Sequence, residues 1–345
     1  MGYENELIFG RILDGLKIIS KYSNFKRVLN LIKVLFSYYL MGNKIYGLPL
    51  LIKVEPTNLC DIECSLCPRK SIKYGFGLLE MEKFKEVINY FSPHSYFVFL
   101  HLWGESVLHK QLGEMIHYVR EKKMCTYLSA NFNNIKEERI LQDLVDSKLD
   151  YLTISLDGID QESYSKYRTG GNFEKVLSNI RKLILYKKKV KSKYPKIILQ
   201  FILMKHNQHD IENVKNLARE LQVDSLDIKT LDAKPVFYGD KQEDFIPTND
   251  KMKRKIYSGG KKNKKKRRKC FWLYGTTHIT WNGKIMPCCV RVFDDEFGDF
   301  SPYTFETLWK SGNVNRLRQN LWKQENITDK DCLKCDFLEG QGFLT

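Results

Sequence analysis

Short apolar runs alternate with longer amphipathic segments over much of this chain. The apolar runs have the length of buried strands, and we predict strands near residues 50–55, 96–102, 125–129, 151–156, 196–203 and 225–229. The segments between them repeat apolar residues at helical spacing, and we predict helices over roughly 80–91, 110–123, 135–147, 172–190 and 210–221. Strands that alternate with helices of this length predict parallel strand–helix–strand units, and therefore an α/β fold.

The two ends of the chain follow other patterns. Residues 12–41 are apolar at helical spacing with basic residues between, so we expect a helical N-terminal extension. Near the other end, the alternating residues 276–281 precede Asn282-Gly283, a strong signal for a tight turn between paired strands. We therefore expect a hairpin there, followed by a helix over roughly 304–322.

The chain is basic, with 57 lysines and arginines against 41 acidic residues and a formal net charge of +16. Residues 261–269 alone hold eight of the basic side chains and follow Gly259-Gly260, which indicates a solvated linker. Aromatic residues do not interleave these charges as they do in RNA-binding segments, so we expect no nucleic-acid partner. An acidic or phosphorylated small molecule would suit the charge equally well.

Three cysteines are spaced as Cys60-x3-Cys64-x2-Cys67, directly after the first predicted strand. A [4Fe–4S] cube has four irons that each take a thiolate, so three cysteines this close can hold three of them. No fourth cysteine lies within fifty residues on either side, which leaves one iron open for a substrate or cofactor. A structural zinc site with a histidine as its fourth ligand is the alternative.

The cysteine spacing, preceded by Glu55-Pro56-Thr57-Asn58, resembles that of the radical S-adenosylmethionine (SAM) enzymes. In that family the cysteines bind a [4Fe–4S] cluster, and SAM chelates the open iron. Reduction then cleaves SAM to methionine and a 5′-deoxyadenosyl radical, which abstracts hydrogen from the substrate. The resemblance implies that the six strand–helix units form a partial (β/α)6 TIM-type barrel, with its site at the C-terminal ends of the strands.

Further segments resemble the elements that bind SAM in this family. Residues 101–106 are similar to its Gly-Gly-Glu segment, although Trp103 replaces the first glycine. Residues 151–158 are similar to its fourth strand, and residues 128–132 to its Thr-Asn-Gly segment. Beside the three cluster ligands, the resemblance therefore implies these SAM contacts: Leu66, Gly104, Glu105, Asn131, Ser155, Asp157, Arg168 and Gln200.

The implied roles follow from the chemistry of SAM. Glu105 would accept a charge-assisted hydrogen bond from the ammonium group. Ser155 would bind the carboxylate, with Arg168 as its cationic partner, because a guanidinium can donate two parallel hydrogen bonds. Leu66 would pack against the adenine, and Asp157 would order the turn after its strand.

Four more cysteines form a second group near the C-terminal end. Cys270 and Cys288 flank the predicted hairpin, and Cys332-x2-Cys335 follows the last predicted helix. Four thiolates saturate either a zinc ion or a [4Fe–4S] cluster. Behind a radical SAM barrel, this group resembles the twitch domain, a short form of the SPASM domain. It implies one auxiliary [4Fe–4S] cluster held by these four residues, with Cys289 as an alternative to Cys288.

The resemblance favours an oxidoreductase. After hydrogen is removed from a carbon that bears a hydroxyl, the auxiliary cluster would accept an electron and a base the proton, leaving a carbonyl on a sugar- or cyclitol-like molecule. Lys229, His206 and Arg291 are candidates for the base by position alone. A flavodoxin or ferredoxin would supply electrons. The alternatives are a maturase that modifies a peptide or protein, and a non-catalytic RNA-binding iron–sulfur protein.

The N-terminal extension has two interpretations. It contains no run of about twenty uncharged apolar residues, so we expect no transmembrane helix, and Glu4 and Glu6 stand where a signal peptide is basic. Residues 1–45 could lie on anionic lipid as an interfacial helix. The interpretation that we favour is packing across the open bottom or side of the barrel.

The expected organisation has four segments. They are an N-terminal helical extension at 1–49, a radical SAM core barrel at 50–232, a connecting segment with the basic linker at 233–269, and a twitch/SPASM-like domain at 270–345. Cys125 is expected to be a core residue. The unpaired, metal-spaced cysteines indicate a reducing cytoplasm.

Overall fold

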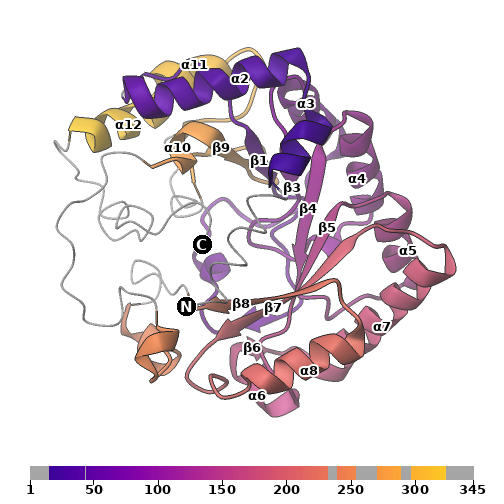
Figure 1. Ribbon diagram of the computed structural model, residues 1–345. Helices are drawn as coiled ribbons and strands as arrows, with labels where there is room; N and C mark the ends of the chain where they lie inside the picture. The colour runs from indigo at the N-terminus through magenta and orange to yellow at the C-terminus, as the bar shows by residue number, and fades with distance from the viewer. Residues whose placement is uncertain (1–14, 43, 232–238, 254–269, 289–296, 324–345) are drawn as a thin grey trace.

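The computed structural model describes residues 15–42, 44–231, 239–253, 270–288 and 297–323. Within these ranges, eight strands form one sheet in the order β10–β9–β1–β3–β4–β5–β7–β8 (Figure 1). Six neighbouring strands run parallel: β1 (Leu51–Val54), β3 (Phe97–Phe99), β4 (Cys125–Ala130), β5 (Tyr151–Ser155), β7 (Lys196–Leu203) and β8 (Ser225–Thr230). They are the six strands predicted from the apolar runs, so the α/β partial barrel is confirmed.

Helices cover the outer face of this sheet (Figure 1). They are α3 (Met81–Phe91), α4 (Leu112–Glu121), α5 (Glu138–Asp146), α7 (Phe173–Lys189) and α8 (Ile211–Leu221). Each agrees with its predicted range to within about three residues, because each buries one apolar stripe at helical spacing on the sheet.

Alternation along the strands separates the two faces of the sheet. In β7, Ile197, Leu199 and Phe201 are buried beneath the helices, while Lys196 and Gln200 point to the inside of the barrel and are only partly buried. Polar residues at alternate positions of the other strands therefore also face the barrel interior.

The predicted C-terminal hairpin is present, and it extends the barrel sheet. β9 (Thr276–Ile279) pairs with β10 (Ile285–Met286) in antiparallel fashion, and Gly283 adopts a positive φ of 85° in the turn between them. β9 also pairs in parallel with β1, from Leu51 opposite Thr276 to Val54 opposite Ile279. The pattern of the hairpin alone gave no indication of this partner strand.

The helix predicted over 304–322 is two helices, α11 (Phe305–Ser311) and α12 (Asn313–Lys323). Gly312 separates them in an extended conformation, and a Cβ at this position would lie 2.7 Å from the carbonyl oxygen of Leu308. The prediction of one continuous helix was wrong because the apolar spacing continues across this break.

Several short elements were not predicted. They are β2 (Glu63–Cys64), α6 (Gln161–Tyr167), β6 (Arg168–Thr169), α10 (Trp272–Gly275) and 3-10 helices at Pro68–Ser71, Ser106–Leu108, Gly239–Asp244 and Asp250–Met252. β2 and β6 form a separate two-stranded sheet.

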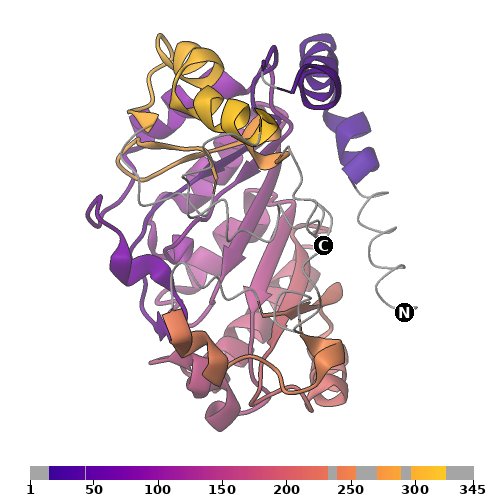
Figure 2. The same cartoon turned by 90° about the vertical axis from the view of Figure 1, so that its left-hand side faces the viewer.

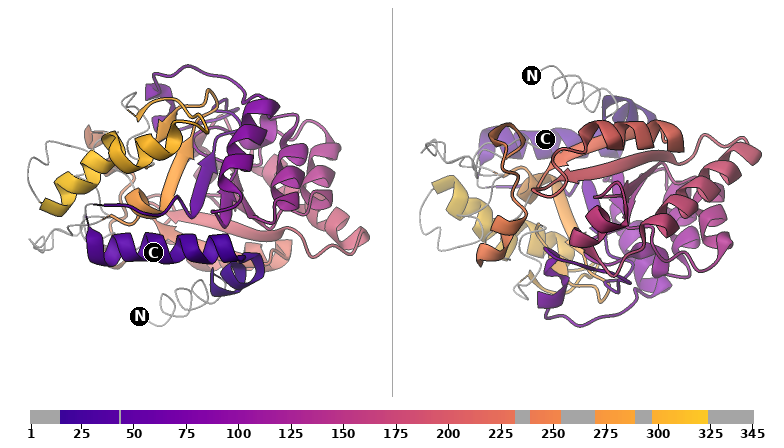
Figure 3. Two further views of the ribbon diagram at one scale, coloured as in Figure 1. Left: turned by 90° about the horizontal axis from the view of Figure 1, so that it is seen from above. Right: turned by 90° about the horizontal axis from the view of Figure 1, so that it is seen from below.

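The N-terminal extension packs on the barrel, as we favoured. Residues 15–22 are helical, and α2 (Phe25–Phe36) continues into a π-helical turn (Ser37–Met41). Figure 2 shows α2 on one side of the molecule and the segment after β1 on the other, and Figure 3 shows α2 along the outer edge. Among the described residues, no helix is both long and apolar enough to cross a membrane.

Candidate functional site

The loop after β1 carries Cys60, Cys64 and Cys67 as free, partly buried thiols. One side of this loop is held by β2, in which Cys64 pairs with Arg168 of β6. The other side is held by Asn58, whose side chain donates to the carbonyl oxygen of Gly75 at 2.6 Å and accepts from the backbone N–H of Gly77 at 2.9 Å. Hydrogen bonds at Asn58 and at Cys64 thus hold the cysteine loop at the C-terminal end of β1.

Burial disfavours free thiolates at these three cysteines, but two nearby donors suit sulfur that is bound to a cluster. Burial raises the pKa of Cys60 to about 12 and also raises the pKa values of Cys64 and Cys67. Two donors approach the sulfurs: Arg168 Nη1 lies 3.5 Å from Cys64 Sγ, and Asn131 Nδ2 lies 3.6 Å from Cys60 Sγ. Such donors stabilise sulfur that carries negative charge, as it does in a cluster.

The three cysteines, all on one loop, have the chemistry to bind a [4Fe–4S] cube. Within the described part of the chain, no three His, Cys, Asp or Glu side chains converge closely enough to hold a single metal ion. A cube takes each thiolate at a different iron, so Cys60, Cys64 and Cys67 need not converge on one point. The three residues can therefore hold three irons, as the sequence spacing predicts.

Arg168 and Asp157, two of the predicted SAM contacts, bind each other. The carboxylate of Asp157 is fully buried and accepts from Arg168 Nε at 2.7 Å and from Nη2 at 2.5 Å. Its second oxygen accepts from the backbone N–H of Ile202 at 2.8 Å. Burial opposes the charged guanidinium, but Asp157 and Cys64 outweigh it and raise the pKa of Arg168.

Ser155 has a different neighbour from the one expected for it. Its hydroxyl accepts from Gln200 Nε2 at 3.4 Å, while Gln200 Oε1 accepts from Lys229 Nζ at 2.7 Å. Ser155 and Gln200 therefore lie together at the ends of β5 and β7. Their roles toward SAM stay predictions.

Glu105 and Asn131 are also brought together. Glu105 is buried, and one carboxylate oxygen accepts from the backbone N–H of Asn131 at 2.5 Å. Burial, reinforced by the nearby carboxylate of Asp61, raises the pKa of Glu105 to about 8. The side chain of Asn131 donates to Asp61 at 2.9 Å. Sequence reasoning missed Asp61, although its position inside the cysteine loop could have indicated it.

Gly104 and Leu66 both lie close to the cysteine loop, and their roles toward SAM stay predictions. A Cβ at Gly104 would lie 2.1 Å from the carbonyl oxygen of Thr57, so only glycine lets residues 101–106 pack against the start of the cysteine loop. Leu66 is buried in a small apolar cluster with Tyr167 and Met204, to which Cys64 is adjacent. This cluster is an apolar surface beside the three thiols.

Glu55 is a structural residue to which sequence reasoning gave no role. It is fully buried and accepts from the backbone N–H groups of Trp103 and Trp281, both at 3.3 Å, and from the hydroxyl of Tyr74 at 3.2 Å. Burial raises its pKa to about 7. One side chain thus joins the segment after β3, the turn of the C-terminal hairpin and the segment after the cysteine loop.

The barrel interior presents a group of cationic and imidazole side chains. His101, which follows β3, lies near Lys53 of β1 and Lys229 of β8, and burial and these two amines lower its pKa well below the usual value. His101 Nδ1 accepts from the backbone N–H of Ser129 at 3.1 Å. Neutral His101 therefore carries its proton on Nε2, where it can donate. The alternation Phe97, Phe99, His101 would have indicated this residue.

The three candidate bases differ in their positions. Lys229 faces the interior and contacts Gln200 and Asp227, the latter at 3.2 Å. His206 follows β7 but lies by Lys166 of α6 and Phe245, away from the inward-facing residues. Arg291 lies outside the described residues.

Part of the predicted auxiliary set can be located. Cys270 precedes and Cys288 follows the β9–β10 hairpin, so they flank its open end. That end lies beside Leu51 at the start of β1, whereas the three-cysteine loop follows the end of β1. Cys289, Cys332 and Cys335 lie outside the described residues, and the ligand set stays a prediction. Cys125 is buried in the core, as expected.

Comparison with known proteins agrees with this geometry. The Radical SAM superfamily model matches residues 54–222, and the model of SPASM, an iron–sulfur cluster-binding domain, matches residues 270–336. The probable GTP 3′,8-cyclase of Methanococcus maripaludis strain S2 is 29% identical over 133 residues, which cover 38% of this chain and 44% of that protein. The chain thus spans less than half the length of this curated relative.

Solved structures share the fold at low identity. The crystal structure of Streptococcus suis SuiB has a TM-score of 0.61 at 14% identity and covers 99% of this chain and 84% of that one. BtrN in complex with AdoMet and 2-DOIA has a TM-score of 0.50 at 16% identity, covering 84% and 93%. The chain therefore belongs to the radical SAM superfamily, as an enzyme that uses SAM and a [4Fe–4S] cluster and carries a SPASM iron–sulfur domain near its C-terminal end.

Proposed function

We propose that this enzyme is an oxidoreductase that converts an alcohol to a carbonyl on a small acidic molecule of the sugar or cyclitol class. When bound, SAM and the two clusters supply the hydrogen-abstracting radical and an acceptor for the second electron. Loss of one hydrogen atom, one proton and one electron balances the oxidation. The observation that carries the proposal is the polar, cationic inner face of the barrel around Lys53, His101 and Lys229.

The inner face suits an anionic polar substrate. The amines of Lys53 and Lys229 favour carboxylate or phosphate groups. His101, whose Nδ1 accepts from the backbone N–H of Ser129, would donate from Nε2–H to a substrate oxygen. The rings of Phe99 and Tyr127 stack at 4.7 Å and offer a flat apolar surface against which a sugar-like ring can pack.

The residues around the cysteine loop would hold the cofactor. Glu105 would accept from the ammonium group of SAM, and Arg168 and Ser155 would bind its carboxylate. The buried cluster around Leu66 would contact the adenine. Asp157 would act through Arg168 by fixing the direction of its guanidinium.

The auxiliary cluster would be held by Cys270, Cys288, Cys332 and Cys335. The metal-binding spacing of the cysteines along the sequence supports a reducing cytoplasm as the compartment, and a flavodoxin or ferredoxin would be the reductant.

Two other substrate classes have support of their own. The second candidate substrate is a nucleoside triphosphate, which is also strongly anionic. It has support because several relatives are named as probable GTP 3′,8-cyclases. A peptide is the third, because SuiB has been solved bound to a precursor peptide. In the described residues 15–42, however, this chain has helices where a peptide-clasping domain of strands and helices would be expected.

The test is anaerobic reconstitution with iron and sulfide, reduction with dithionite, and detection of 5′-deoxyadenosine after SAM is added. We expect about eight irons in the wild type and about four in the Cys60→Ala/Cys64→Ala/Cys67→Ala variant, which should release no 5′-deoxyadenosine. Cys125→Ala is the matched control, because this buried cysteine is outside both ligand sets. Equal iron in the triple variant and the wild type would overturn the ligand assignment.

The substrate class is read from isotope transfer. Deuterated cyclitols, sugar phosphates, GTP and a peptide are supplied in turn, and 5′-deoxyadenosine is analysed for deuterium. Transfer from a cyclitol or sugar, with a carbonyl in the product, supports the proposal. Transfer from GTP or from the peptide alone would replace it with the corresponding alternative.

A further inference from the structure

Helix α2 is amphipathic, but the side that faces the protein is only partly apolar, and most of its apolar residues lie on the other side. In a helix that packs on a water-soluble fold, the apolar stripe normally points to the core. In α2, the residues buried against the barrel are Arg27, Asn30 and Val34. The apolar stripe points away from the barrel, where a helix of this kind usually carries its charges.

Arg27 fixes this orientation through backbone carbonyl groups of the barrel. Its guanidinium donates to Ser92 at 2.7 and 3.1 Å, to Lys122 at 2.9 Å and to Lys123 at 2.5 Å. Ser92 and Lys122 are the C-terminal caps of α3 and α4, whose last carbonyls have no partner within their helices. A cation is favourable at both helix ends.

Asn30 adds a second anchor one turn along the helix. Its side-chain amide donates to the carbonyls of Leu48 at 2.9 Å and His94 at 3.1 Å and accepts from the N–H of Leu48 at 2.8 Å. Rolling α2 to bury its apolar side would break all these bonds. The outward direction of the apolar stripe is therefore built into the fold.

The outward stripe is long and continuous at helical spacing. Phe25 is 82% exposed, Ile32 is 57% exposed, and Tyr39 and Leu40 in the π-helical turn are both 68% exposed. The exposed apolar residues of α2 and the following turn are Phe25, Val28, Leu29, Ile32, Leu35, Phe36, Tyr39 and Leu40. We call these eight residues the α2 stripe. A contiguous apolar patch of this kind marks an interaction surface.

The charged residues of the segment that carries the stripe are all positive. Residues 15–46 contain no Asp or Glu, and the lysines at 17, 21, 26, 33 and 44 are exposed. Lys26 and Lys33, seven residues apart, lie on one flank of the stripe. Lysines at the edge of an apolar helix face can extend to anionic headgroups while the apolar side chains enter the lipid.

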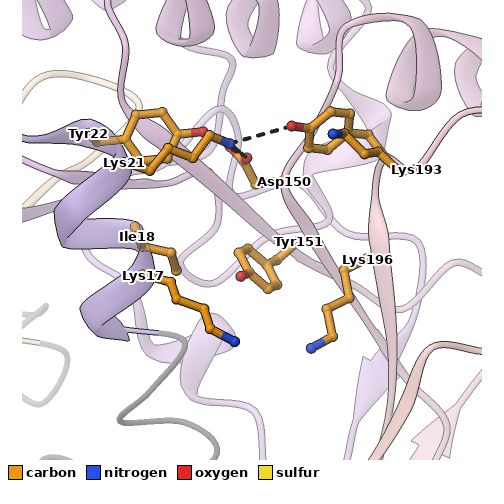
Figure 4. A pocket seen from close by; sticks show the side chains of 9 residues that line it. Lys17, Ile18, Lys21, Tyr22, Asp150, Tyr151, Lys193 and Lys196 are labelled. Atoms are coloured by element: carbon orange, nitrogen blue, oxygen red, sulfur yellow. Dashed lines mark hydrogen bonds and ion pairs between the residues drawn. The ribbon is translucent and has the colours of Figure 1, made fainter.

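A basic pocket lies beside the helical segment that precedes α2 (Figure 4). It has a volume of about 210 Å³ and lies at the N-terminal ends of β5 and β7. Four of its lining residues are lysines, at 17, 21, 193 and 196, and its one carboxylate, Asp150, is already bound by Arg120 at 2.6 Å. Lys17 and Lys21, in the helical segment that precedes the stripe, thus belong to a basic pocket.

We propose that the α2 stripe docks on the surface of an anionic lipid bilayer, with its apolar side chains among the acyl chains and the flanking lysines on the headgroups. The charge of this segment favours lipid over a second copy of this chain, because two such faces would bring the lysines of residues 15–46 close together, and this segment holds no Asp or Glu. Arg27 and Asn30 hold α2 in the orientation that keeps its apolar stripe on the outside, where it could enter the bilayer.

The test uses the full-length reconstituted enzyme in flotation with vesicles of phosphatidylcholine alone or with about one third phosphatidylserine. We expect binding to the anionic vesicles and weak binding to neutral ones, with loss of binding as salt increases. Lys26→Gln/Lys33→Gln should weaken the affinity about fivefold for each lysine removed. Leu29→Ser/Ile32→Ser should weaken it about tenfold or more.

Matched controls are available on α7. Leu185 and Val190 are 66% and 42% exposed, close to the 57% and 41% of Ile32 and Leu29. Leu185→Ser/Val190→Ser therefore removes a similar amount of exposed apolar side chain from a different face of the protein. Lys182→Gln/Lys189→Gln controls for charge. Controls should bind like the wild type, and all variants should keep the wild-type iron content and far-UV circular dichroism.

Three results would overturn the proposal. One is equal binding by the wild type and Leu29→Ser/Ile32→Ser, and another is an equal loss in the α7 controls. The third is a wild type that forms a dimer and does not bind vesicles, while the stripe variant is a monomer. That result would mean that the stripe binds a second copy of the chain. None of these readouts depends on catalysis, so they are independent of the proposed oxidation.

Discussion

Arg168 and Asp157 form a buried ion pair next to the cluster loop, with Arg168 Nε 2.7 Å from Asp157 Oδ2. The same guanidinium lies 3.5 Å from Cys64 Sγ. Asp157→Asn would leave this cation without its counter-ion, and we expect it to lower the free energy of unfolding by about 3–5 kcal/mol. Denaturant unfolding of the reconstituted enzyme measures this change.

The control for this prediction is an exposed pair of the same charge types. Glu162 binds Lys166 at 3.0 Å on the surface of α6, and Glu162→Gln should change stability by less than about 0.5 kcal/mol. Similar effects of the two substitutions would show that Asp157 does not anchor Arg168.

Gly104→Ala should separate the two segments that meet at the site. The added Cβ would lie 2.1 Å from Thr57 O and 2.6 Å from Asn58 Cα, and backbone cannot move aside as a flexible side chain can. We expect a loss of about 2–3 kcal/mol in stability and at least a tenfold lower yield of 5′-deoxyadenosine. Gly15→Ala, where a Cβ meets nothing within 4 Å, should leave both values unchanged.

Glu55 should make stability fall as the pH rises. Its pKa is about 7 in the folded state against an ordinary value of 4.5, so the folded protein holds a proton that the unfolded chain loses between these values. The free energy of unfolding should therefore fall by about 3 kcal/mol from pH 4.5 to pH 7 through this residue alone. Glu55→Gln cannot titrate and should lack this part of the pH dependence.

Unfolding at pH 5, 6, 7 and 8 in denaturant compares the wild type with Glu55→Gln. Glu63→Gln is the control, because Glu63 is exposed and binds Lys70 at 2.6 Å. Parallel curves for the wild type and Glu55→Gln would contradict the assignment.

Arg27→Gln tests the anchor of α2. Glutamine cannot reach the carbonyl groups at the ends of both α3 and α4, and it leaves several of them buried without donors. We expect the free energy of unfolding to fall by about 3 kcal/mol or more. Lys26→Gln, one residue away and exposed, should change it by less than about 0.5 kcal/mol. Thermal unfolding followed by circular dichroism distinguishes the two.

The barrel could be predicted from the sequence because its units are local. Each of the six parallel strands and of the five helices that cover them is identified by apolar spacing within its own segment, and parallel order follows from their alternation. The pairing of β9 with β1 could not be predicted in this way, since it joins Leu51 to Thr276 across most of the chain. No periodic pattern within either segment names the partner strand.

The same distinction holds at the site. Cys60, Cys64 and Cys67 are identified by their own spacing, and Glu105 and Arg168 by short motifs. The contacts between motifs are tertiary. Arg168 could be placed near the cluster by resemblance, but its bond to Asp157 depends on how the residues after β5 lie against β6, which no local pattern gives. Glu55 illustrates the limit, because its partner Trp281 is 226 residues away.

The opposite placement of α2 and the cysteine loop determines which way an attached enzyme faces. Arg27 of α2 binds the C-terminal ends of α3 and α4, on the side of the barrel where its strands begin, whereas Cys60, Cys64 and Cys67 follow the C-terminal end of β1. On a bilayer, the barrel mouth would open toward the aqueous phase, with the lipid behind it. A water-soluble substrate and a diffusing electron donor would then arrive from the same side, and neither would have to cross the lipid to reach the site.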